Sequence, residues 1–252
     1  MCTVVLLSRP GHDWPVLIGA NRDEMADRPW DPPARHWADR PEVLAGRDRL
    51  AVGSWLGIND SGVVACVLNR RHTLGPDAHK RSRGELVLEA LDHADAVDAA
   101  GALAELAPDS YRGFNLLIAD NRDAYWLKNE GGRIAVEALP PGLTMLTAVD
   151  RNEPTHPRVA RHLPRFEAAA PPDPATGDWS AWTDILASRA DASPEDAIAI
   201  VPQRPGGFAT VSSALIALPA GSSSGPSPRI RSIFLFAAGL PGAAPYRAVA
   251  DL

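Results

Sequence analysis

Cys2 is the residue of this sequence whose type and position most directly suggest chemistry. Initiator methionine is readily removed before a small side chain, so processing of Met1 would leave a thiol and a free α-amino group on one residue. The α-amine has an ordinary pKa of about 7.7–8.0, and its neutral form can take the proton of an attacking thiol. Cys2 is therefore a candidate N-terminal nucleophile. The alternative is an incidental residue at the start of a buried strand.

Four polar residues, Asn21 to Glu24, directly follow the apolar run VLIGA. A turn at RPGHDWP makes residues 2–8 and 16–20 a predicted hairpin, which would bring this quartet beside the start of the first strand. Asp23 could then hold the new ammonium, and the charge of Arg22 could lower the pKa of the thiol. The alternative is a solvated turn in which an Asp/Arg ion pair contributes little.

Asn69 ends the strand-like run GVVACVLN and is the candidate oxyanion donor. A neutral side-chain amide can donate a hydrogen bond to the oxygen that becomes negative during acyl transfer. The period-two alternation of a strand places Asn69 on one face and Cys66 on the other. Cys66 is therefore predicted to be a buried structural thiol and not a second nucleophile.

Strand-like and helix-like patterns are segregated along the chain, which favours an α+β fold over alternating βαβ units. Two antiparallel sheets packed together and covered outside by helices would bury both faces of each sheet. Residues 25–41 contain four prolines and are expected to form a loop at the surface or at the mouth of a site. GSSSGPSP is expected to be a flexible connection between the last two strands. The remaining predicted strands are 53–60, 62–69, 114–120, 123–129, 133–139, 143–149, 210–218 and 229–238, with 114–149 forming a meander, and the predicted helices are 85–95, 96–107, 156–170 and 179–188.

Length, charge and cysteine content restrict the class of protein. A chain of 252 residues is expected to form one domain, residues 1–252. The net charge of -6 argues against a nucleic-acid partner, because such proteins carry basic surfaces. Two cysteines exclude a disulfide framework and an all-cysteine metal site. With no signal-peptide pattern and no apolar stretch of membrane-spanning length, the expected location is the cytoplasm. The oligomeric state stays open.

Five segments, in this order, resemble the NRDE family of proteins related to transport and Golgi organisation protein two: MCTVVLL, ANRDE, GSWLGIND with its following LN, RSRGELV and YRGFNLLIAD. The resemblance covers residues 1–120 well and weakens over 156–188. The opening segments are also similar to the choloylglycine hydrolase and penicillin V acylase group of N-terminal-nucleophile hydrolases. That similarity implies a four-layer αββα sandwich and cleavage of an amide or related acyl bond of a small molecule.

Carried over by position, the resemblance implies Cys2 as nucleophile, Asp23 as the residue near the freed amine and Asn69 as the oxyanion amide. The chain also departs from the hydrolases. Arg22 lies a few residues after the position of their first arginine, so it would reach the site from a shifted register. Their later asparagine has no counterpart in LTAVD, and Val211 stands where NRDE relatives often carry arginine.

A second function is a non-catalytic carrier of haem or of an acyl-CoA or lipid ligand, because eukaryotic NRDE relatives are associated with both. Candidate haem ligands are His36, His72, His79 and His156, but the chain has no Cys-Pro pair and no closely spaced histidine pair. No cofactor is predicted, with haem kept as a ligand of this alternative only. The tryptophans Trp14, Trp30, Trp37 and Trp55 are expected near the mouth, where they would suit a flat or acyl ligand, or else ordinary packing.

Overall fold

The computed structural model describes residues 2–75, 77–189, 195–221 and 231–250, and in them two antiparallel sheets pack face to face. The first, sheet A, has the strand order β10-β1-β2-β11-β12-β13. Its strands are β1 (Thr3–Ser8), β2 (Val16–Met25), β10 (Gly142–Leu146), β11 (Phe208–Leu218), β12 (Ile233–Ala237) and β13 (Arg247–Ala248).

The second sheet, sheet B, runs in simple sequence order from β3 to β9. Each strand pairs with the next along the chain, so short turns suffice to connect most of them. Its strands are β3 (Trp30–Ala34), β4 (Val43–Asp48), β5 (Leu56–Asn59), β6 (Val64–Asn69), β7 (Phe114–Ala119), β8 (Ala124–Asn129) and β9 (Ile134–Ala138).

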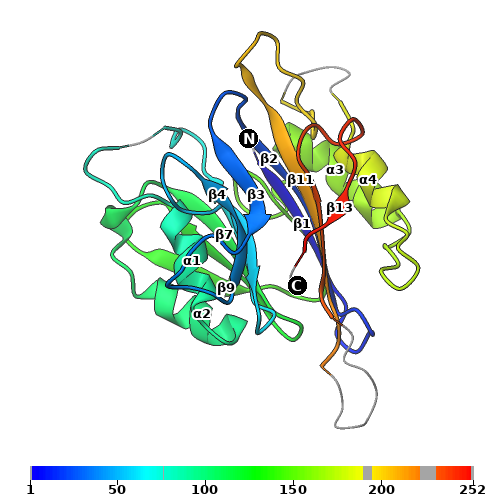
Figure 1. Cartoon of the computed structure of the whole chain (residues 1–252), viewed down its shortest axis with the longest axis horizontal. Helices are drawn as coiled ribbons and strands as arrows, with labels where there is room; N and C mark the ends of the chain where they lie inside the picture. The colour runs from blue at the N-terminus through cyan, green and yellow to red at the C-terminus, as the bar shows by residue number, and fades with distance from the viewer. Residues whose placement is uncertain (1, 76, 190–194, 222–230, 251–252) are drawn as a thin grey trace.

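Helices cover the outer face of each sheet, which gives the predicted four-layer αββα sandwich (Figure 1). The helices on sheet B are α1 (Gly84–Leu91) and α2 (Ala96–Ala104), and those on sheet A are α3 (Pro157–Ala168) and α4 (Ser180–Leu186). A single 3-10 turn, η1 (Pro108–Ser110), precedes β7. None of the described helices is long and apolar enough to cross a membrane.

Side chains alternate between the two faces of a strand, so each sheet contributes to two apolar cores, one on each face. In β1, Val4 and Leu6 contribute to the core between the sheets, whereas Val5 packs into the core beneath α3 and α4. In β6, Cys66 lies in the core between the sheets and Ala65 lies beneath α1 and α2. Successive side chains of a strand point to opposite faces, so apolar residues at consecutive positions are buried on both. The predicted burial of Cys66 is confirmed.

The first hairpin forms as predicted, but its second strand is longer than the apolar run that indicated it. β2 continues through the polar quartet to Met25, because its far edge pairs with β11 over Phe208–Leu218. The hydrogen bonds that stabilise this extension come from a strand almost two hundred residues away in the sequence. Asn21 to Glu24 therefore lie inside a sheet and not in a turn.

Other differences concern the strands at the sheet edges. The expected loop at residues 25–41 contains β3, an edge strand in which two prolines are tolerated because one side of an edge strand needs no ladder hydrogen bonds. The sequence patterns also missed β4. The predicted meander ends at β9, because β10 crosses to sheet A and pairs with β1. Most of the GSSSGPSP segment lies outside the described residues.

Candidate active site

The thiol of Cys2 lies against the backbone of β2. Pairing of Thr3 with Asn21 brings Cys2 alongside Arg22 and Asp23. Its Sγ accepts a hydrogen bond from the Asp23 N–H at 3.4 Å and lies 3.5 Å from the Asp23 carbonyl oxygen, to which the S–H can donate. The residue is partly exposed. The predicted neighbourhood of Cys2, Arg22 and Asp23 is thus present in the structure, while their catalytic roles stay a prediction.

The carboxylate of Asp23 is fixed by two buried side chains from distant parts of the chain. Arg158 on α3 donates from Nη1 to Asp23 Oδ2 at 3.1 Å and to Thr3 Oγ1 at 2.9 Å. Thr210 on β11 donates to Asp23 Oδ1 at 2.5 Å, and its own Oγ1 accepts from the Ile200 N–H at 2.8 Å. A carboxylate held by an arginine and a hydroxyl is fixed in its orientation inside the protein.

The sequence patterns gave no sign of Arg158 or Thr210. Arg158 lies in the region where the family resemblance weakens, 135 residues after Asp23. Its side chain is only 2% exposed although it carries a charge. A buried charge is rare unless it is paired, but burial at this position of α3 follows from packing that no local pattern reveals.

The environment of Cys2 keeps its thiol protonated in the resting site. Burial raises the pKa of the thiol above its ordinary value, and the negative charge of Asp23 raises it further. The Asp23 N–H and the positive charge of Arg22 lower this pKa by less. Arg22 therefore acts in the predicted direction but does not produce a thiolate. Attack by Cys2 needs a base that removes its proton.

Arg22 is held between aromatic rings at the base of the site. Its guanidinium lies 4.1 Å from the ring centroid of Trp55, and its Nη2 is 3.7 Å from Asp48 Oδ2. Trp55 fits flat over β4 only because Gly46 has no side chain, since a Cβ there would come within 2.4 Å of the indole. Arg22 is 6% exposed, and its Nη1 has no hydrogen-bond partner among the described residues. A buried charged donor of this kind is suited to an oxygen of a bound ligand.

Cys2, Arg22, Asp23 and Asn69 all line one cleft with a volume of ≈ 520 Å³. That size lies within the usual range of small-molecule sites, about 300–1,000 Å³. Asn69 lines this cleft and Cys66 does not, while the oxyanion role of Asn69 stays a prediction. Trp55 is the sole one of the four predicted tryptophans among the described residues of the cleft wall.

The other three tryptophans pack against the apolar cores, so for them the alternative of ordinary packing holds. Trp14 is buried in the core beneath α3 and α4. Trp30 packs against the core between the sheets, where its ring meets that of Trp55 edge to face. Trp37 packs against the core beneath α1 and α2. Aromatic residues supply large buried areas, and in this fold three separate cores use them.

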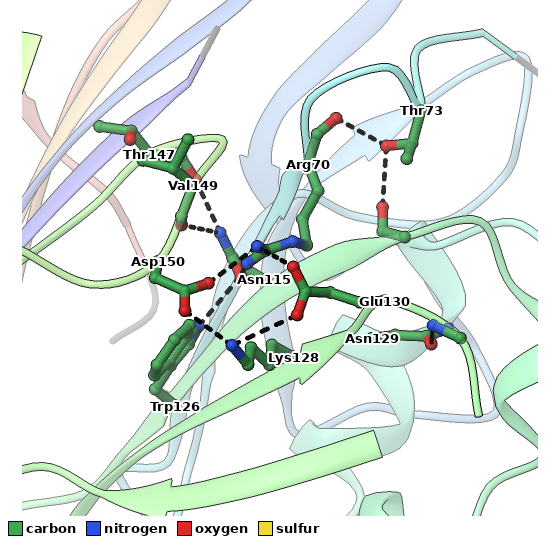
Figure 2. A network of polar contacts seen from close by, with 12 residues as sticks. Arg70, Thr73, Asn115, Trp126, Lys128, Asn129, Glu130, Thr147, Val149 and Asp150 are labelled. Carbon is green, nitrogen blue, oxygen red and sulfur yellow. Dashed lines mark hydrogen bonds and ion pairs between the residues drawn. The ribbon is translucent and has the colours of Figure 1, made fainter. Parts of the chain in front are cut away.

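A polar network fixes the chain beyond Asn69 and ties the two sheets together (Figure 2). Asn115 on β7 donates from Nδ2 to the carbonyls of Thr147 at 2.9 Å and Val149 at 2.7 Å, in the segment after β10. Arg70 donates from Nη1 to Asn115 Oδ1 at 2.7 Å and from Nη2 to Asp150 at 2.8 Å. These contacts hold the LTAVD segment, which lacks the asparagine of the hydrolases, by two backbone carbonyls and by the carboxylate of Asp150.

The departure from NRDE relatives at Val211 coincides with an irregularity of β11. The pairing register of β2 and β11 shifts between Thr210 and Ser212, which makes Val211 the extra residue of a bulge. Val211 is buried, and it does not line the Cys2 cleft. A bulge redirects the side chains on either side of it, and here Thr210 points to Asp23.

Different labelling rates of the two thiols are expected from their environments. Cys2 opens onto the cleft, whereas Cys66 is buried in a core that raises the pKa of its thiol. Iodoacetamide should alkylate Cys2 much faster than Cys66, at a rate that rises from pH 7 to pH 9.5 because only the thiolate reacts. Peptide mass spectrometry would measure both rates. Replacing Arg22 with alanine should slow labelling of Cys2. An unchanged rate would show that the charge of Arg22 does not affect the reactivity of the thiol.

Comparison with known proteins agrees with this architecture. The chain has a fold similar to that of a Caenorhabditis elegans N-acylethanolamine-hydrolyzing acid amidase ortholog, at 13% identity and a TM-score of 0.58, over 85% of this chain and 92% of that one. It is similar to penicillin V acylase from Agrobacterium tumefaciens at 14% identity and a TM-score of 0.52, over 94% and 83%. A mutant conjugated bile acid hydrolase from Clostridium perfringens gives 12% identity and a TM-score of 0.56, over 99% and 92%. At such identities the likeness establishes the fold alone.

Sequence comparison defines the family. No curated protein matches the chain. The model of the family Transport and Golgi organisation 2, by contrast, matches residues 1–197, well beyond residue 120, where the resemblance of the motifs weakens. The match includes Cys2, the polar quartet of β2, the end of β6 and the Arg158 helix. The chain belongs to the Transport and Golgi organisation 2 family.

Proposed function

We propose that this protein is an N-terminal-cysteine hydrolase that cleaves an amide or related acyl bond of a small molecule. One observation carries the proposal: the Cys2 thiol is hydrogen-bonded to the backbone of Asp23 at a cleft large enough for a small molecule. Arg158 and Thr210 fix the carboxylate of the same Asp23. The fold shared with an amidase, an acylase and a bile acid hydrolase supports it.

Removal of Met1 supplies the base that the thiol needs. The α-amine of Cys2 is neutral in part near pH 8 and can accept the S–H proton directly or through one water. The carboxylate of Asp23 stabilises the ammonium that forms.

The acyl transfer then proceeds in two halves. Sγ forms a bond to the carbonyl carbon, and the carbonyl oxygen takes up negative charge that the side-chain amide of Asn69 and the free Nη1 of Arg22 can stabilise. Collapse breaks the bond to the leaving amine, which takes the proton from the ammonium and departs, so a thioester remains on Cys2. Water deprotonated by the α-amine attacks the thioester, and the acid leaves as the thiol is restored.

The proposal requires a free amine on Cys2 in the mature protein. Intact mass and N-terminal sequencing of protein expressed in cells should show that Met1 is absent and that Cys2 is unblocked. Hydrolysis should appear only in the processed fraction, since the methionyl form lacks the amine at the right residue. Full activity in a preparation that retains Met1 would contradict the proposed base.

Haem binding is the outcome that would favour the carrier alternative. Among the described residues, no histidine lines the Cys2 cleft. His36, His72 and His79 are on the surface or close to it, and His156 is buried in a site that lowers its pKa to about 4. If haem bound tightly and one histidine variant lost it, while acyl-homoserine lactones, N-acyl amino acids, β-lactams and acyl-CoA thioesters were not cleaved, the carrier function would stand.

A cytoplasmic location is part of the same proposal. Both cysteines are free thiols, which fits a reducing compartment such as the cytoplasm. The proposed partner is the small-molecule substrate.

A further inference from the structure

His156 is a buried side chain without a hydrogen-bond partner among the described residues. The residue is 2% exposed, and neither Nδ1 nor Nε2 of its ring contacts a described donor or acceptor. Leaving a buried polar group unpaired costs about 1–3 kcal/mol, so most such groups in folded proteins have a partner. The ring of His156 therefore calls for a partner that the described contacts do not include.

His156 occupies the N-cap position of α3 without capping the helix. Its carbonyl accepts a hydrogen bond from the Ala160 N–H at 2.9 Å, and its own N–H donates to the Glu153 carbonyl at 3.1 Å. Its side chain forms no cap hydrogen bond. N-cap positions usually carry Ser, Thr, Asp or Asn, whose side chains bind the free N–H groups of the first turn. The backbone thus fixes this residue, while its ring is not used by the helix.

The start of α3 lies against the first residues of β1. Arg158 lies two positions after His156 in the sequence. Its Nη1 donates to Thr3 Oγ1 at 2.9 Å and to Asp23 Oδ2 at 3.1 Å. Thr3 follows Cys2 directly, and the Asp23 backbone binds the Cys2 thiol. The helix end that carries His156 is therefore held at the residues that flank the nucleophile.

The segment after β6 approaches the same place from sheet B. The Arg71 N–H donates to the Ala148 carbonyl at 2.9 Å. The pairing of β1 with β10 reaches Val4 and Leu146, and two further steps in the same register would set Cys2 opposite Ala148. Arg71 and the start of α3 thus lie on two sides of the amino-terminal end of β1.

The charged groups that act on the His156 ring come from all these elements. They are Arg71, Arg158, the amino terminus of the chain and Glu153. Burial and the three positive charges lower the pKa of His156 to about 4, so at neutral pH the imidazole is uncharged and presents one nitrogen lone pair. Glu153 is engaged elsewhere, because its Oε1 accepts from the Thr155 N–H at 3.1 Å and from Thr155 Oγ1 at 2.8 Å.

Processing of the chain creates a donor for this lone pair. Arg71 and Arg158 are already in place and do not donate to the ring. Removal of Met1, by contrast, turns the backbone nitrogen of Cys2 into an α-amino group with N–H donors in both of its protonation states. A hydrogen bond to a neutral acceptor is stronger from the ammonium than from the amine, so such a contact favours the charged form.

We propose that His156 is a positioning residue: in the processed chain one of its ring nitrogens accepts a hydrogen bond from the α-amino group of Cys2. Asp23 stabilises the same group through a second N–H. The third position on the nitrogen then faces the thiol, and it carries the lone pair of the amine or the proton that the leaving group takes. The catalytic role rests on the proposed hydrolase function, whereas the contact itself requires only the removal of Met1.

The contact is measured without turnover by NMR of the full chain labelled with nitrogen-15 histidine. Two forms are compared, the processed chain that begins at Cys2 and the chain that retains Met1. The acceptor nitrogen of His156 should move upfield in the processed form, as a ring nitrogen does when it accepts a hydrogen bond. The signals of His162 should stay unchanged, because its Nε2 already donates to the Asp196 carbonyl at 2.7 Å.

The pKa of the Cys2 α-amine is the second readout, followed by NMR of its nitrogen in protein labelled with nitrogen-15 cysteine. His156→Phe should lower this pKa by about 0.5–1 unit, because the ammonium loses an acceptor. His156→Gln keeps a neutral acceptor and should stay within about 0.3 unit of the native value. For a substrate that is cleaved, the acid limb of kcat/KM should move to lower pH with the amine, whereas a structural defect lowers the rate at every pH.

His162→Phe is the matched control on the same helix. His162 is 0% exposed, and burial lowers its pKa to about 4 as well. Its ring has partners, however, because Nδ1 accepts from Arg165 Nη1 at 3.0 Å in addition to the bond that Nε2 forms. The substitution disturbs α3 without removing an acceptor from the amine, so the pKa of the Cys2 amine should keep its native value.

The outcomes for His156 and for the hydrolase are distinct. Unchanged His156 signals in the processed form, an unchanged amine pKa in His156→Phe, or an equal fall in His162→Phe would overturn the positioning role. If the variants do not fold, the comparison of the two native forms decides. Hydrolysis by the processed native chain is measured separately. Cleavage without the contact would keep the hydrolase and overturn the role of His156, whereas the contact without cleavage would keep the contact and overturn the hydrolase.

Discussion

Replacing Cys2 with alanine is expected to reduce hydrolysis of a cleaved substrate by at least about 10⁴-fold, because enzymes that act through a covalent nucleophile lose that much when it is removed. The variant should still bind the ligand with an affinity within about tenfold, or about 1.4 kcal/mol, of the native value. Since the thiol accounts for little of the cleft wall, its loss removes chemistry and not binding. Progress curves and calorimetric titration measure the two quantities.

Two further variants make the result specific to this site. Cys66→Ala should retain activity, because Cys66 is buried between the sheets and lines only the small recess beside Cys2, not the larger cleft, and its thiol has a raised pKa. Asn69→Ala should lose about 10²- to 10³-fold in rate, as expected for one oxyanion donor, again with little change in affinity. Retained hydrolysis in Cys2→Ala, or its loss in Cys66→Ala, would show that the nucleophile is elsewhere.

Replacing Arg158 with alanine is expected to destabilise the fold by about 3–5 kcal/mol, because it removes one member of a buried ion pair and leaves the other, the carboxylate of Asp23, in the interior. The pair lies 3.1 Å apart with side chains 2% and 0% exposed, so water cannot take the place of the guanidinium without rearrangement. Urea unfolding monitored by tryptophan fluorescence measures the change in free energy of unfolding.

Arg161 on the same helix is the matched control. It pairs with Asp196 at 3.0 Å, but its side chain is 28% exposed. Arg161→Ala should cost about 0–1 kcal/mol, the usual range for a solvated ion pair. Adding Asp23→Asn to Arg158→Ala should recover part of the lost stability, since it removes the buried negative charge with which Arg158 pairs. Equal costs for Arg158 and Arg161 would contradict a central role for the Asp23 carboxylate network.

The sequence by itself determined the layers of the fold and the first half of the site. Period-two runs identified most strands of both sheets, and apolar spacings of three and four identified the four helices. The hairpin predicted from the local sequence was sufficient to place Cys2 beside Arg22 and Asp23, because its two strands pair directly with each other. Alternation along β6 was sufficient to separate Asn69 from Cys66, since neighbouring residues of a strand point to opposite faces.

Only the tertiary structure decided which strands are neighbours and which distant side chains complete the site. Nothing local requires β10 to leave the meander for β1, or the polar quartet to remain in a strand, since both depend on pairing with partners far along the chain. Arg158 and Thr210 come to the carboxylate of Asp23 from segments that packing alone brings together. The physical reason is that local propensity and periodicity depend on neighbours in sequence, whereas a buried ion pair depends on neighbours in space.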